Sequence, residues 1–211
     1  MSKAEAQLKK ERLAKSQRKT IFQGKILNLH LEKLFFKGGK TKEKEIVEHP
    51  GAVVCLPVNA AKKIFLIKQY RRAVDSILIE LPAGRIEKNE KPLFAAQREL
   101  REETGYKAAQ LIRLGGFLTT PGFSNEFLHL FLALGLKKSP LAPDADEKLD
   151  LMEASLEEAL QMVQTGLIQD AKTISALLYY LLWQTGSKPL SALKNRLFEK
   201  TELPRPASGL K

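Results

Sequence analysis

The segment from Gly84 to Tyr106 constrains this chain more than any other part of it. Its helical pattern over Pro92–Thr104 carries Glu99, Glu102 and Glu103, at spacings of three and four residues. Residues three and four apart are neighbours on one helix face, where like charges cost about 0.2–0.5 kcal/mol per pair. We therefore expect a cation to neutralise these carboxylates, whose oxygens are the ligands that Mg²⁺ prefers.

The same segment contains residues that would hold this helix in place. Leu93, Ala96 and Leu100 fall on one apolar stripe, which we expect to be buried. Gly84 and Gly105 bracket the helix. We expect Gly84 to let backbone approach a ligand closely, and Gly105 to end the helix.

Arg98 is placed to pair with Glu102 one turn ahead, or with Glu90 in the preceding loop. Taken together, these positions resemble the Nudix box, Gly-x5-Glu-x7-Arg-Glu-U-x-Glu-Glu-x-Gly-U, where U is a bulky apolar residue. Every fixed position of that pattern is met here. A solvated, glutamate-rich helix without function does not account for so complete a match.

The resemblance extends over residues ~20–183, which are similar to the ADP-ribose pyrophosphatase branch of the Nudix hydrolases. Pro121 lies sixteen residues after Gly105, a spacing that in this superfamily points to ADP-ribose. The other matching stretches are Glu45–Ala52, Lys68–Arg72, Glu80–Gly84 and Asp170–Thr173.

The resemblance implies an α+β fold, an α/β/α sandwich with a small N-terminal β-hairpin subdomain. It also implies hydrolysis of ADP-ribose to AMP and ribose 5-phosphate with Mg²⁺ or Mn²⁺. Glu99, Glu103 and the Ala83 carbonyl would be metal ligands, with Glu102 as a ligand or base. Relatives add a glutamate from a later loop, where Glu147 matches best as ligand or general base and Asp146 is the alternative.

Substrate contacts are implied in the same way. Arg71 matches an arginine that reaches the phosphates, while Glu80 and Glu126 match polar positions near the ribose and the mobile loop. Pro121 and Gly122 belong to the loop whose spacing indicates ADP-ribose. Relatives place an Arg-Glu pair at the adenine side, where this chain has Lys44 and Glu45. Lysine lacks the planar guanidinium of arginine, so the contacts to adenine are the part of the resemblance that this difference affects.

The chain divides by composition into four parts. We expect a basic arm (1–20, a frayed helix or disordered), a β subdomain for dimerisation (21–48), a Nudix hydrolase domain (49–186) and a basic tail (187–211). In the β subdomain a hairpin turns at Gly38-Gly39, and Phe22, Phe35 and Phe36 pack in the core or at a dimer interface. We expect strands over 53–58, 64–67, 77–81, 111–119 and 127–136, and helices over 92–104, 156–166 and 171–183, the second opened by a Ser155–Glu158 capping box.

Charge and cysteine content limit the kinds of binding partner and covalent cross-link that we expect for this chain. The 35 basic and 24 acidic residues give a net charge of +11, but residues 21–186 hold 22 basic against 20 acidic ones. The excess therefore belongs to the two ends, and nucleic acid is not expected as the substrate. Cys55, the single cysteine, excludes a disulfide framework, and the chain shows neither a membrane span nor a secretory signal. We expect a cytoplasmic homodimer acting on a small nucleoside diphosphate.

Three alternatives stay open. The box selects diphosphate chemistry, so another nucleoside diphosphate sugar or a dinucleotide could be the substrate. A non-catalytic ADP-ribose sensor is a second reading, although such proteins usually lose box glutamates. An RNA-binding or cap-processing protein is a third, and it predicts salt-sensitive RNA affinity that is lost when both ends are trimmed.

Overall fold

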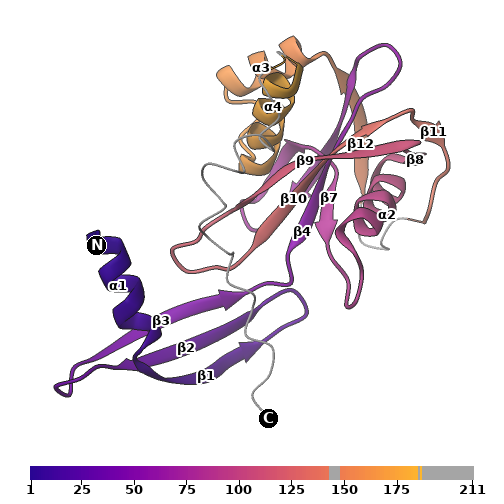
Figure 1. Cartoon of the computed structure of the whole chain (residues 1–211). Coiled ribbons are helices and arrows are strands. Elements are labelled where there is room, and N and C mark those ends of the chain that lie inside the picture. Colours follow the sequence, from indigo (N-terminus) through magenta and orange to yellow (C-terminus); the bar gives the residue numbers. More distant parts are fainter. Residues whose placement is uncertain (143–147, 185, 187–211) are drawn as a thin grey trace.

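The computed structural model describes residues 1–142, 148–184 and 186, and its main body is a layered α/β/α arrangement (Figure 1). Four strands form the central sheet in the order β7-β4-β10-β9, with β4 and β10 parallel and the other pairs antiparallel. Their bounds are β4 (Ala52–Pro57), β7 (Ala83–Arg85), β9 (Gln110–Leu118) and β10 (Phe127–Leu134).

The two faces of β4 belong to two different hydrophobic clusters. Val53 and Cys55 pack with Ala96 and Leu100 of helix α2 (Pro92–Thr104), while Val54 and Leu56 face the other way, toward helix α4 (Ala171–Gln184). Successive strand residues point to opposite faces of a sheet. A strand that is apolar at every position is therefore buried on both sides, which confirms the sandwich.

A second sheet, in the order β12-β5-β6, completes the body. Its strands are β5 (Ile64–Arg71), β6 (Ser76–Glu80) and β12 (Leu149–Ala154), all antiparallel. Helix α3 (Leu156–Gln164) follows β12 and has the Ser155–Glu158 capping box that the sequence predicts. The short strands β8 (Tyr106–Lys107) and β11 (Lys137–Lys138) pair beside α2.

The N-terminal part forms a separate sheet to one side of the body (Figure 1). It contains β1 (Lys15–Gln23), β2 (Asn28–Phe35) and β3 (Thr41–Glu48), and the β2–β3 hairpin is confirmed. Of the two expectations for residues 1–20, a helix and a disordered arm, the structure has a helix, although it is capped and is followed by a strand that begins at Lys15. Helix α1 (Lys3–Arg12) begins with a Ser2–Glu5 capping box, and the boundary after residue 20 falls inside β1.

Helix α2 has the bounds that its pattern predicts, and it ends at Gly105, whose φ of 76° is left-handed. Leu93 is 45% exposed, so it does not belong to the buried stripe, and Ala95 takes the inward position beside Ala96 and Leu100. Within the described residues, no helix is both long and apolar enough to cross a bilayer. The short helix expected near residues 190–198 lies outside the described residues.

Candidate active site

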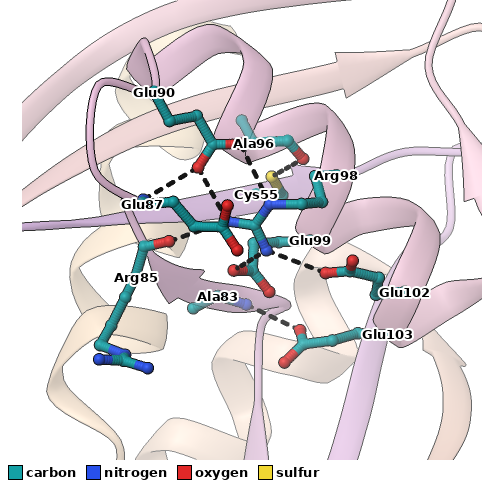
Figure 2. A network of polar contacts seen from close by, with 10 residues as sticks. All are labelled: Cys55, Ala83, Arg85, Glu87, Glu90, Ala96, Arg98, Glu99, Glu102 and Glu103. Atoms are coloured by element: carbon teal, nitrogen blue, oxygen red, sulfur yellow. Dashed lines mark hydrogen bonds and ion pairs between the residues drawn. The ribbon is translucent and has the colours of Figure 1, made fainter. Parts of the chain in front are cut away.

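Arg98 is the centre of a partly buried polar network between α2 and the strand β7 (Figure 2). Its Nε and Nη2 donate to the two carboxylate oxygens of Glu90, at 3.1 and 2.9 Å. Its Nη1 donates to Glu99 at 2.7 Å and to Glu102 at 3.0 Å. Sequence reasoning offered Glu90 and Glu102 as alternative partners, whereas one guanidinium serves both and Glu99 as well. The Glu90 hydrogen bonds and the nearby carboxylates raise the pKa of Arg98.

The carboxylate of Glu99 lies against the backbone of Gly84. A β-carbon at Gly84 would fall 2.0 Å from Cδ of Glu99 and 2.1 and 2.3 Å from its two oxygens. No side chain other than hydrogen fits there. The glycine allows the close approach of Glu99 to the strand. The sequence predicts instead that Gly84 lets the backbone approach a ligand, and that role stays a prediction.

Glu103 is tied to the same short strand. The backbone N–H of Ala83 donates to Glu103 Oε2 at 2.8 Å (Figure 2). Glu99 and Glu103 are both largely buried, at 8% and 7% exposed. Cys55 lies under the same helix turn: burial, followed by the charges of Glu103 and Glu99, raises the pKa of its thiol. Two acidic side chains one turn apart thus meet the Ala83–Gly84 backbone.

This donor set fits a hard divalent cation. Arg98 binds the carboxylates of Glu90, Glu99 and Glu102, and the carboxylate of Glu103 lies one turn from Glu99 on the backbone N–H of Ala83. Across the described ranges, no three His, Cys, Asp or Glu side chains converge as a ready-made cage. Mg²⁺ does not need one, because it takes one or two carboxylates and fills its remaining positions with water and substrate phosphate.

Arg71 and Glu80 lie next to this cluster but bind each other. Arg71 Nε and Nη2 donate to the two oxygens of Glu80, at 2.8 and 2.6 Å. The hydrogen bonds and charge of Glu80 raise the pKa of Arg71, and the charge of Glu103 contributes. Glu80 is three residues before Ala83, whose N–H binds Glu103. Glu80 is 1% exposed, so the expectation that it contacts substrate is revised: its carboxylate is buried and holds Arg71.

The remaining predicted substrate residues line a different surface. Lys44, Glu45, Pro121 and Gly122 border one groove of about 740 Å³ between β3 and the β9–β10 loop. Its third wall is α1, whose Glu11 lies 3.7 Å from the amine of Lys44. Binding pockets for small molecules typically measure ~300–1,000 Å³, so this groove is large enough for a nucleoside.

Glu126 lies at the end of the same loop. Its Oε2 accepts a hydrogen bond from Thr119 at 2.8 Å, and Oε1 lies 3.5 Å from His49 Nδ1. Burial lowers the pKa of His49 and outweighs the opposing charge of Glu126. Glu147 and its alternative Asp146 are outside the described residues, so their roles stay predictions.

Sequence reasoning missed two contributors. Helix α1 was not expected to border the groove, although Ser2 and Glu5 have the spacing of a capping box. The second is Lys172, which contacts Glu80 from the first turn of α4. The sequence comparison matched this segment to relatives but assigned it no role. Asp170 accepts from the N–H of Thr173 at 3.0 Å, so the Asp-x-x-Thr spacing was a usable helix-start signal.

Comparisons with known proteins agree with this geometry. A family model described as NUDIX domain matches residues 48–177. An ADP-ribose pyrophosphatase of Bacillus subtilis (strain 168) is 42% identical over 177 residues, which cover 83% of this chain and 94% of that protein. A methanol dehydrogenase activator of Bacillus methanolicus is 42% identical over 77% of this chain and 89% of its own length. A solved ADP compounds hydrolase shares the fold, with a TM-score of 0.73 at 22% identity over 83% of this chain and 96% of that one.

Proposed function

Because the chain belongs to the Nudix family, we propose that it hydrolyses the diphosphate bond of ADP-ribose to AMP and ribose 5-phosphate, with Mg²⁺ or Mn²⁺. The observation that carries this proposal is the meeting of Glu99 and Glu103 with the Ala83–Gly84 backbone, with Arg71 alongside. Nudix hydrolases generally use a divalent metal ion. The pyrophosphatase relative supports the choice of substrate.

Each group has a role in that reaction. Glu99, Glu103 and the carbonyl of Ala83 would hold the cation, which would neutralise the diphosphate and lower the pKa of a bound water. Arg98 fixes Glu99 and Glu102 at 2.7 and 3.0 Å, so both are oriented before substrate arrives. Glu102 is less buried than its neighbours and would serve as ligand or base, as would Glu147. Water adds to one phosphorus, and the bridging oxygen leaves with the other phosphate.

Recognition of the nucleoside is assigned to the groove beside β3. Lys44 and Glu45, which match the pair at the adenine side in relatives, border it together with Pro121 and Gly122. The ion pair with Glu11 holds the Lys44 amine toward α1. Glu126, held by Thr119, would stay at the ribose side of the loop.

A substrate panel tests the activity. We expect purified protein with Mg²⁺ to release AMP from ADP-ribose with a higher kcat/KM than from sugar nucleotides, NADH or diadenosine polyphosphates. A different best substrate would replace ADP-ribose within the same chemistry. Absence of release from every member would favour the ADP-ribose sensor. Affinity for RNA that falls steeply with salt and is lost on trimming both ends would favour the nucleic-acid alternative.

We also propose that the N-terminal sheet mediates a cytoplasmic homodimer. Phe22 pairs with Leu29 across β1 and β2, and Leu31 and Phe35 lie on the same face of β2. Phe22 and Phe35 are 57% and 39% exposed in the single chain. Exposed aromatic side chains on a face that also carries charged residues, here Lys19 and Lys33, are typical of a protein interface.

Light scattering after size exclusion tests the dimer. We expect the mass of two chains for the wild type and of one chain for Phe22→Glu, because a carboxylate on this face would be buried without a partner. The matched control is Leu178→Glu, which places the same charge on an exposed leucine of α4 and should leave the dimer intact. A wild-type protein that runs as one chain at micromolar concentration would contradict the proposal.

A further inference from the structure

Glu80 is a buried carboxylate shared by two cations from different parts of the chain. Arg71, at the end of β5, binds both of its oxygens. Lys172, in the first turn of α4, contacts Glu80 Oε2 through its amine. Burial alone would disfavour the ionised form, but the bonds and charges of Arg71 and Lys172 lower the pKa of Glu80 below its usual value. A buried carboxylate stays charged only when it is paired in this way.

The two cations differ in their access to solvent. The Arg71 side chain is 39% exposed, whereas that of Lys172 is 15% exposed and lies between two acids, with Asp170 Oδ2 at 3.0 Å. Arg71 is therefore the member that can reach a ligand. Its contact with Glu80 uses Nε and Nη2, so Nη1 lies outside the bidentate pair.

The same helix start also supports the backbone that leads to the metal ligands. The Thr173 hydroxyl donates to Asp170 at 2.6 Å and accepts from the N–H of Leu81 at 2.8 Å. Thr173 is fully buried. Leu81 is two residues before Ala83, whose N–H binds Glu103. The first turn of α4 thus touches both the carboxylate that holds Arg71 and the backbone just before β7, the strand whose Ala83 binds Glu103.

We propose that Lys172 is a positioning residue for binding of the diphosphate. Its amine neutralises part of the charge of Glu80, so that the Arg71 guanidinium can bind the substrate phosphates. This inference rests on the proposed function, since it deepens the role of Arg71 in the same site. With Lys172 present, Arg71 can direct some of its hydrogen bonds to phosphate while Glu80 keeps a cationic partner. Without Lys172, Arg71 is the remaining cation that the described residues place on Glu80, and Glu80 then competes with the substrate for it.

Binding of a non-hydrolysable ADP-ribose analogue, with a methylene group in place of the bridging oxygen, tests the proposal in Mg²⁺ by calorimetry. We expect Lys172→Met to weaken binding about tenfold. Lys172→Arg should bind within about threefold of the wild type, because it restores the cation. The matched control is Lys63→Met, which removes an exposed ion pair with Glu158 at 2.9 Å and should leave binding unchanged.

A double-mutant cycle separates positioning from a general structural effect. In an Arg71→Ala background, Lys172→Met should cost little further affinity, because its effect acts through Arg71. In steady-state assays the same substitution should raise KM more than it lowers kcat. Equal losses of affinity with and without Arg71, or unchanged binding in Lys172→Met, would overturn the inference.

The outcomes also distinguish this inference from the proposed function. Weaker analogue binding in Lys172→Met, in a protein that turns over no nucleoside diphosphate, would keep the role of Lys172 and reject the enzymatic activity. Normal turnover of ADP-ribose together with unchanged analogue binding in the variant would keep the enzymatic activity and reject the role of Lys172. Thermal unfolding of each variant establishes that the comparison is between folded proteins.

Discussion

Glu103→Gln is expected to lower the turnover of ADP-ribose by at least about 100-fold while the protein stays folded. The amide keeps the shape of the side chain, and its oxygen can still accept the 2.8 Å hydrogen bond from Ala83. What it removes is one negative charge from the face shared with Glu99. Because like charges four residues apart repel on a helix, the free energy of unfolding without metal should stay equal or rise slightly.

Two measurements check this expectation. The kcat at saturating Mg²⁺ should fall, and a titration with Mn²⁺ followed by electron paramagnetic resonance should show weaker metal binding. Glu157→Gln is the matched control, since it makes the same change in charge on the exposed first turn of α3 and should retain wild-type turnover. Turnover close to wild type in Glu103→Gln would refute its assignment as a metal ligand.

Gly84→Ala should lower turnover by about 10- to 100-fold, the range typical of substitutions that disturb the support of a metal site. The added methyl group would lie 2.0–2.3 Å from the carboxylate of Glu99, which would have to move away from the strand. Gly84 does not have a positive φ, so the backbone itself accepts alanine. The loss is therefore expected in metal binding and turnover more than in stability.

Gly38→Ala provides the complementary comparison. Gly38 lies in the β2–β3 turn with φ of 84°, and an added methyl group there meets nothing within 4 Å. We expect this variant to lose about 1 kcal/mol of stability, because alanine disfavours a left-handed backbone, and to keep its turnover. If Gly84→Ala kept full turnover and metal affinity, the close packing of Glu99 on the strand would be irrelevant to catalysis.

Local patterns predicted the body of the fold well, for physical reasons that act over a few residues. Helix α2 has the predicted bounds, because Pro92 suits its first turn and Gly105 adopts the left-handed conformation that ends it. Strand β4 was recognised from its unbroken apolar run, which burial on both faces explains. Leu93 was misassigned because the apolar stripe covers a limited arc, and the sheet contacts Ala95 in its place.

The errors near the N-terminus have a different origin. Strand β1 is exposed along its whole length, so no alternation of apolar residues marks it. It is a strand because it pairs with β2, a contact between residues up to 20 positions apart, such as Lys15 and Phe35. Helix α1 buries no side chain, so its local signals were the Ser2–Glu5 capping box and the basic residues of its last turn, Lys9, Lys10 and Arg12.

The sequence by itself determined the chemistry of the site. Glutamates three and four residues apart must share a helix face, so a cluster of carboxylates on one side of α2 followed from spacing alone, and with it the expectation of a bound cation. The tertiary structure decided which charges meet across the chain. It brought Arg71, Glu80 and Lys172 together from three elements, and turned Glu80 from an expected substrate contact into the buried partner of two cations. Such pairing depends on how strands and helices pack, because a carboxylate excluded from water needs its counter-charges within hydrogen-bond distance, whatever their separation in the sequence.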